Sequence, residues 1–164
     1  MLAVAQGILD RGGQIALLGT GEKAIEAAVR TLVAENPGRV AALIGYSEGL
    51  SHRIEAGSDM FLMPSLFEPC GLNQMYSLRY GSVPIVHATG GLRDTVEDGV
   101  TGFVFHQPTA HAFWLAIEHA LDLYAQKPAW KKLMTTGMNR DFSWKKSALA
   151  YQAVYGRLLD TKTP

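Results

Sequence analysis

The chain has 164 residues, of which 48% are hydrophobic and 18% charged, a composition typical of one folded domain and unlike that of a disordered segment. Fifteen basic residues balance fifteen acidic ones, so charge gives no reason to expect nucleic acid or an anionic membrane as a partner. The single cysteine, Cys70, excludes an internal disulfide and a cysteine-based zinc site, and it favours a reducing, intracellular compartment.

The first predicted helix covers residues 1–11 and places Leu2, Ala5, Ile8 and Leu9 on one face. A pair of glycines ends it. This segment lacks the basic start of a secretory signal peptide, and polar residues interrupt its apolar ones. No apolar run in the sequence approaches the ~20 residues that a membrane span needs. We therefore expect an amphipathic helix here and no membrane partner.

Short apolar runs bounded by glycine, proline or other turn residues predict five strands, the first two of them buried. These strands span residues 14–18, 39–44, 59–63, 82–86 and 102–105. Helical patterns fill most of the intervals and the end of the chain. These helices span residues 22–35, 47–56, 72–80, 109–125, 128–138 and 143–159, the last with Asp141 or Ser143 as its cap. Residues 89–91 are expected to form a loop.

Strands that alternate with helices at this spacing predict βαβ units, and hence a doubly wound α/β domain with a parallel, Rossmann-like sheet. We expect residues 1–164 to form one such domain, which the family resemblance described below suggests is incomplete at its N-terminus. Ligands of such sheets bind outside the carboxyl ends of the strands. The loops of interest are therefore those at residues 19–21, 45–48, 64–71 and 88–91.

The loop after the third strand combines one carboxylate, Glu68, with successive backbone donors at the start of a helix. Cys70, Gly71, Leu72 and Asn73 all carry an N–H group. Such a helix start attracts an anion or sugar hydroxyls, and Glu68 would accept hydrogen bonds from a sugar at its mouth. The alternative is that Glu68 only caps the helix, and spacing alone favours neither role.

Two further loops carry residues suited to a ligand. At Thr89-Gly90-Gly91, two glycines allow the backbone to approach a phosphate closely, although an ordinary turn explains them equally well. Tyr46, at the end of the second strand, would stack on a nucleobase or pack on the neighbouring helix. The five histidines show no metal-binding spacing, and the sequence lacks the nucleophile elbow, the P-loop and a complete dinucleotide motif.

Residues 64–76, Pro-Ser-Leu-Phe-Glu-Pro-Cys-Gly-Leu-Asn-Gln-Met-Tyr, resemble the pattern P-S-x-F-E-P-C-G-L-x-Q of the glycogen and starch synthases. The agreement continues through residues 79–86 and through Thr-Gly-Gly-Leu-Arg-Asp-Thr-Val at 89–96. Gly45-Tyr46, Ser51-His52 and the closing residues 141–144 also match. The similarity extends over essentially the whole chain.

The resemblance implies a GT-B glycosyltransferase, in which two Rossmann-like domains enclose the active site. Such enzymes transfer glucose from ADP-glucose to the non-reducing end of an α-1,4-glucan and retain the anomeric configuration. It implies no metal and no other cofactor. By the same resemblance Glu68 acts on the donor glucose, and Tyr46 stacks on adenine. The N–H groups of residues 70–72 hold glucose and diphosphate, and the other donor-binding residues are Ser65, Asn73, Thr89, Gly90 and Gly91.

The chain also departs from the wider family. Many related glycosyltransferases carry a second glutamate where this chain has Tyr76, a difference that the glycogen and starch synthases share. The connection at residues 96–101 is shorter than in many synthases. The resemblance implies that the Arg and Lys contacting the diphosphate, and the whole acceptor-binding domain, precede residue 1. We therefore expect the chain to carry the donor-binding half only and to be inactive by itself.

Two alternatives remain from the sequence. One is another retaining GT-B enzyme that uses UDP-glucose, and the other is a non-catalytic module that binds a nucleotide sugar or a glucan. Glycogen and starch are not distinguished, and the compartment implied is the bacterial cytoplasm or a plastid.

Overall fold

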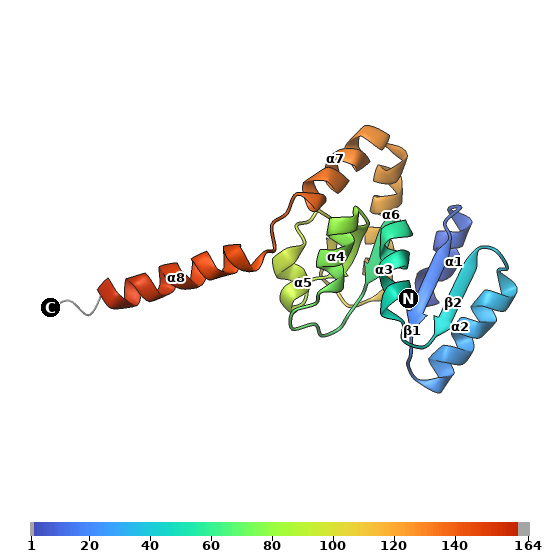
Figure 1. The fold of residues 1–164 in the computed structure, drawn as a ribbon. Helices are drawn as coiled ribbons and strands as arrows, with labels where there is room; N and C mark the ends of the chain where they lie inside the picture. The colour runs from blue at the N-terminus through green and yellow to red at the C-terminus, as the bar shows by residue number, and fades with distance from the viewer. Residues whose placement is uncertain (1, 161–164) are drawn as a thin grey trace.

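The structure is a computed structural model that describes residues 2–160. Five strands and eight helices alternate along these residues (Figure 1), which confirms the doubly wound α/β class. The strands are β1 (Ile15–Gly19), β2 (Val40–Ile44), β3 (Met60–Met63), β4 (Val83–His87) and β5 (Phe103–Phe105). The helices are α1 (Leu2–Asp10), α2 (Lys23–Glu35), α3 (Glu48–Gly57), α4 (Asn73–Tyr80), α5 (Gly90–Thr95), α6 (Ala110–Ala125), α7 (Lys127–Met138) and α8 (Trp144–Asp160). Met1, where the first helix was expected to begin, and residues 161–164 of the expected domain lie outside the described residues.

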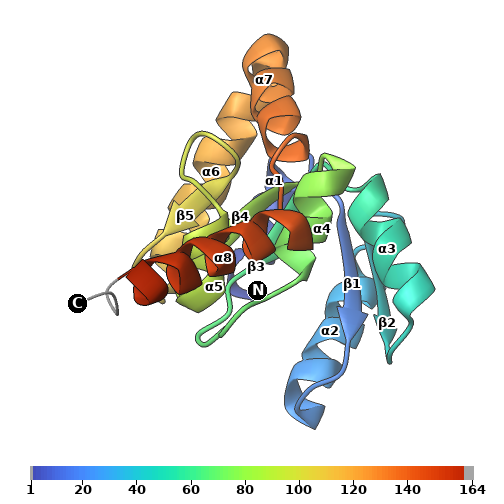
Figure 2. The same cartoon turned by 60° about the vertical axis from the view of Figure 1, so that its left-hand side comes forward.

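The strands form two parallel sheets where the sequence predicted one. β1 pairs with β2, from Ile15 opposite Val40 onward. The second sheet has the order β3-β4-β5, with Met60 opposite Val83 and Ile85 opposite Phe103. Figure 2 shows β1 and β2 standing apart from β3, β4 and β5. Among the described strands, β1 and β3 therefore each have a neighbour on one side only.

The burial of each strand depends on whether it has neighbouring strands on both sides or on one side only. All five residues of β4 are buried, as expected for an inner strand of an α/β sheet. In β1 only Ile15 is buried, and no residue of β3 is buried. In β2 only Val40 is buried. The expectation that the first two strands are buried is thus wrong, because among the described residues β1 and β2 form a sheet of two strands, and each of them has an open edge.

One hydrophobic core nevertheless connects the two sheets. It includes Ile15 of β1 and Ile85 of β4, together with Ile8 of α1 and Ile117 of α6. A smaller cluster of Val86, Leu92 and Val96 lies beneath α5. Helices α1 and α6 contact each other, and α3 contacts α4, so each pair of helices forms part of one layer.

Most predicted helix ends agree with the structure to within one or two residues. Ser47 caps α3 by accepting a hydrogen bond from the N–H of Leu50 at 3.3 Å, and Thr109 caps α6 in the same way. Gly81 ends α4 in the left-handed conformation. At the start of α8, Asp141 accepts from the N–H of Ser143 at 2.8 Å. The expectation of a loop at residues 89–91 is wrong in part, because Gly90 already begins α5.

Helix α8 extends away from the rest of the described chain (Figure 1). None of its residues from 144 to 159 is buried, and its exposed side chains include Trp144, Tyr151 and Leu159. Of the helices that the structure describes, none is long and apolar enough to cross a membrane.

Candidate functional site

The loop at residues 64–72 joins β3 to α4 and leaves the start of that helix open. Leu72 is the N-cap residue, and no side chain caps the helix. Within the described part of the chain, the N–H groups of Cys70, Gly71, Leu72 and Asn73 have no hydrogen-bond acceptor. Unpaired N–H groups and the positive end of the helix dipole together favour an anion or sugar hydroxyls at this position.

Glu68 lies in the same loop, four residues before the N-cap. Its side chain is half-buried, and its carboxylate makes no hydrogen bond or ion pair with the residues that the structure describes. The sequence left open whether Glu68 accepts hydrogen bonds from a sugar or caps α4. Capping of α4 by Glu68 is not observed. The carboxylate remains available to accept hydrogen bonds from a ligand.

The two glycine-containing loops are in direct backbone contact. The N–H of Gly91 donates to the carbonyl oxygen of Glu68 at 3.1 Å. A Cβ atom on Gly90 would overlap that same carbonyl oxygen, and one on Gly91 would overlap the carbonyl oxygen of Cys70. Gly90 also has a φ of +41°, which side chains rarely allow. These glycines are thus needed for contact between the loops, a reason that the sequence did not indicate.

The side chain of Gln74 holds the backbone of the loop at residues 64–72 in place. Its side chain is fully buried, and its Nε2 lies 3.1 Å from the carbonyl oxygen of Cys70 and 2.9 Å from that of Gly71. The same atom also donates to Oγ1 of Thr95, 3.1 Å away, and that hydroxyl donates to the carbonyl oxygen of Gly91. Gln74 was quoted in the family motif but not recognised as a positioning residue. The buried face of α4 carries Gln74 together with Ser77 and Leu78, so no apolar pattern marked the amide as unusual.

A second support comes from β4. The ring of His87 is 8% exposed, and its Nδ1 donates to the carbonyl oxygen of Ser65 at 2.8 Å. The ring of Phe105 lies 5.4 Å from it, centroid to centroid. His87 is therefore a buried histidine with a hydrogen-bond partner, and it fixes the beginning of the loop at residues 64–72.

Tyr46 follows β2 and directly precedes the cap of α3. Its side chain is 88% exposed, so the alternative in which it packs on the neighbouring helix is wrong. The arrowheads of β1 and β2 point to the lower edge of Figure 1, the side on which the Glu68 loop also lies. Six residues after Tyr46, the ring of His52 in α3 lies 5.4 Å from the ring of Tyr76 in α4, centroid to centroid. No contact among the described residues joins Tyr46 to Glu68 itself.

The loop at residues 64–72 itself carries one carboxylate, Glu68, and one thiol, Cys70. The described residues contain no cluster of three His, Cys, Asp or Glu side chains that could hold a metal ion. Cys70 is an exposed, free thiol. The chemistry that this arrangement offers is one free carboxylate beside a row of fixed N–H donors.

Residues 17–133 match the family model described as "Glycosyl transferases group 1". The chain is 52% identical over 159 residues to a glycogen synthase from Cellvibrio japonicus, covering 92% of this chain and 33% of that protein. It is 53% identical over 156 residues to a glycogen synthase from an Anaeromyxobacter species, again covering 92% of this chain and 33% of that protein.

A solved structure, the catalytic domain of starch synthase IV from Arabidopsis thaliana bound to ADP and acarbose, is 37% identical with a TM-score of 0.84. The superposition covers 94% of this chain and 34% of that one. The chain thus spans about one third of the length of the curated relatives that it matches.

Proposed function

The chain belongs to the group 1 glycosyl transferases, and from this premise we propose that it is the donor-binding half of a glycogen or starch synthase. The proposed reaction transfers glucose from ADP-glucose to the non-reducing end of an α-1,4-glucan with retention of configuration. The names of the two bacterial relatives and of the plant structure with ADP and acarbose support this assignment. Since the chain spans a third of those relatives, the activity is proposed for the longer protein.

The open start of α4 is the observation on which the proposal mainly depends. The N–H groups of Cys70, Gly71 and Leu72 lie at the start of α4 and have no acceptor among residues 2–160, and Gln74 holds the neighbouring carbonyl groups. Such donors stabilise a diphosphate and the hydroxyls of the attached glucose without having to reorganise when charge develops. We assign them to the donor, and no metal or other cofactor is assigned.

Glu68 is proposed as the catalytic carboxylate. Its position next to these donors suits a group that orients the glucose and opposes positive charge at the anomeric carbon. Its carboxylate has no partner among the described residues, so a ligand would not have to displace one.

Tyr46 is proposed to stack on the adenine ring. Its face is exposed at the carboxyl end of β2, and stacking on a flat ring would cover it. Ser65, Asn73, Thr89, Gly90 and Gly91 are proposed to line the same site. The bacterial relatives support the bacterial cytoplasm as the compartment.

The test replaces Glu68 by Ala in the longer protein and measures the incorporation of labelled glucose from ADP-glucose into glycogen. We expect turnover to fall by about 10²-fold or more, with unchanged thermal stability. Asp94→Asn is the matched control, because Asp94 is an exposed acid near the same loops, and its ion pair is with the neighbouring Arg93, at 3.7 Å. An unchanged rate in the Glu68 variant would favour the non-catalytic binding module instead.

Calorimetry on the same protein separates the two donors. Tighter binding of ADP-glucose than of UDP-glucose is expected, and the reverse order would favour the alternative UDP-glucose enzyme. The 164-residue chain alone is expected to show no turnover, and robust incorporation of glucose by it would contradict the assignment of only half the site.

A further inference from the structure

The proposed donor site is divided between two neighbouring helices, α3 and α4 (Figures 1 and 2). Tyr46 directly precedes Ser47, the N-cap residue of α3. Glu68 and the unpaired N–H groups lie at the N-terminal end of α4. A displacement of α3 along α4 would therefore change the distance between the two parts of the site.

The ring of His52 in α3 packs against two tyrosines of α4. Its centroid lies 5.4 Å from that of Tyr76 and 6.0 Å from that of Tyr80. Its Nδ1 lies 3.3 Å from the hydroxyl oxygen of Tyr80, within hydrogen-bond distance. The two tyrosines are four residues apart in α4, so they lie one above the other on the same helix face. His52 thus contacts two consecutive side chains of one row.

Contacts with two side chains of one row restrict sliding of α3 along α4. A slide by one residue moves a helix by about 1.5 Å along its axis. It would bring the ring of His52 closer to one tyrosine and separate it from the other. Side chains that pack into the rows of a neighbouring helix set the relative position of two helices in this way.

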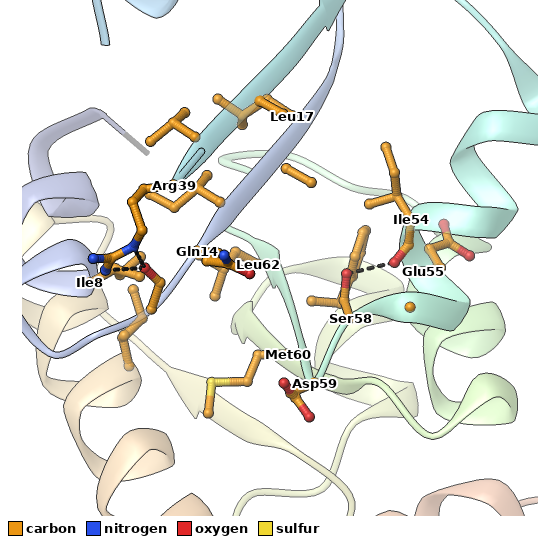
Figure 3. A pocket seen from close by; sticks show the side chains of 18 of the residues that line it. Ile8, Gln14, Leu17, Arg39, Ile54, Glu55, Ser58, Asp59, Met60 and Leu62 are labelled. Atoms are coloured by element: carbon orange, nitrogen blue, oxygen red, sulfur yellow. Dashed lines mark hydrogen bonds between the residues drawn. The ribbon is translucent and has the colours of Figure 1, made fainter. Parts of the chain in front are cut away.

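The opposite flank of α3 has less support. A cavity of about 1000 Å³ lies there, between the two sheets, and Ile54 and Ser58 line it (Figure 3). Figure 3 also shows Ile8 of α1 across this cavity, and the carboxylate of Glu55 on the α3 side of it. Among the helices and strands that the structure describes, α4 is the one with which α3 makes extensive contact. The position of α3 at this edge therefore depends on α4.

We propose that His52 is a positioning residue, which holds α3 against α4 and so sets the distance between Tyr46 and the N–H donors of α4. This role rests on the proposed function, in which Tyr46 stacks on the adenine and these donors hold the diphosphate. A nucleoside diphosphate contacts both parts of the site, so its affinity depends on their separation. A diphosphate without a base contacts only the α4 part.

Tyr80 provides a second way to disturb the same contact. It is the last residue of α4, about 10 Å along the helix from the first turn, so it lies away from the donor site. An effect of Tyr80 on nucleotide binding would therefore have to pass through His52 and α3.

The test measures the binding of ADP and of inorganic pyrophosphate to the longer protein by calorimetry. We expect His52→Ala to weaken ADP binding about 10-fold, the effect of one lost base stack, and to leave pyrophosphate binding unchanged. Tyr80→Ala should act in the same direction. His52→Phe retains a ring against both tyrosines and should restore most of the affinity for ADP.

A double-mutant cycle with Tyr46 identifies the route of the effect. Tyr46→Ala alone should also weaken ADP binding about 10-fold. Because His52 is proposed to act through Tyr46, His52→Ala should cause no further loss in the Tyr46→Ala protein. Two losses that multiply would show that His52 acts on ADP by another route, and would overturn the proposal.

His119→Ala is the matched control. The ring of His119 in α6 also packs edge-on against an aromatic ring, that of Phe103, at 5.1 Å. This variant should bind both ligands as the unmodified protein does.

Two further results would overturn the role of His52. Equal losses of ADP and pyrophosphate binding in His52→Ala would show a general effect on the fold, and unchanged ADP binding would show that the contact does not position Tyr46. Failure of the proposed function is recognised separately, without any variant. In that case the unmodified protein would bind pyrophosphate but bind ADP no more tightly, which would overturn the assignment of Tyr46 and the role of His52 with it.

Discussion

At the scale of single residues, the geometry of the Glu68 loop depends on side chains that lie behind it. Gln74 holds the carbonyl groups of Cys70 and Gly71, and His87 holds that of Ser65. Because these carbonyls are tied back into the domain, the N–H groups of the following peptides remain directed outward. The site is thus pre-organised before any ligand binds.

Gly91→Ala tests this contact between loops. Its Cβ would overlap the carbonyl oxygen of Cys70, so the loop must shift. We expect a loss of about 1–3 kcal/mol in the free energy of unfolding. We also expect about 10²-fold lower turnover in the longer protein, because small displacements of positioned donors are costly. Urea unfolding and the glucose incorporation assay measure the two effects.

Gly21→Ala is the control for this variant, since nothing lies within 4 Å of the Cβ that it adds. Its effect on stability should stay within about 0.5 kcal/mol. Equal effects of the two substitutions would mean that the close approach of Gly91 does not matter.

Glu55 gives a prediction of pH dependence. Burial raises the pKa of this carboxyl above its ordinary value of 4.5, although His52 and a hydrogen bond from Ser51 act in the opposite direction. The side chain is 2% exposed, and Oε2 has no hydrogen-bond partner. The folded state therefore binds the proton more tightly than the unfolded state, and stability is lost as the pH rises from 4.5 through the raised pKa.

Glu55→Gln should remove this loss. The variant is expected to be more stable than the parent chain at neutral pH, with the difference vanishing as the pH falls toward 4.5. Urea unfolding between pH 4.5 and 8 measures it. Glu48→Gln, at an exposed position of the same helix, is the control. A difference that does not change with pH would refute the role of burial.

At the scale of helices and strands, the sequence predicted positions well because the signals are local. Ser47, Thr109 and Gly81 mark helix ends by hydrogen bonds and backbone angles within a few residues. The positions of the loops that would bind a ligand were also predictable, because in such a sheet they follow the carboxyl ends of the strands.

What the sequence did not predict depends on contacts between distant segments. Helix α5 begins with two glycines, which disfavour a helix, and it is fixed by contact with the Glu68 loop. The support from Gln74 through Thr95 joins residues 21 positions apart. Burial of β1 and β2 was overestimated, because the hydrophobicity of a strand does not show how many neighbouring strands pair with it.

At the scale of the whole molecule, the two sheets share one core despite the gap between them. Helix α1 contributes Val4, Ala5, Ile8 and Leu9 to a cluster that includes Ile15 of the first sheet and residues of β4 and β5 in the second. We therefore expect the 164-residue chain to unfold as one cooperative unit, and not as two sheets in succession.

Ile8→Ala tests this coupling. Ile8 is 7% exposed and belongs to the shared core, so its truncation should cost about 2–4 kcal/mol. If the core is one unit, amide exchange in β1 and in β4 should accelerate by the same factor. Ile25→Ala on α2, where the side chain is 51% exposed, should change neither rate appreciably. Acceleration in β1 and β2 alone would mean that the gap already divides the chain into two independently stable parts.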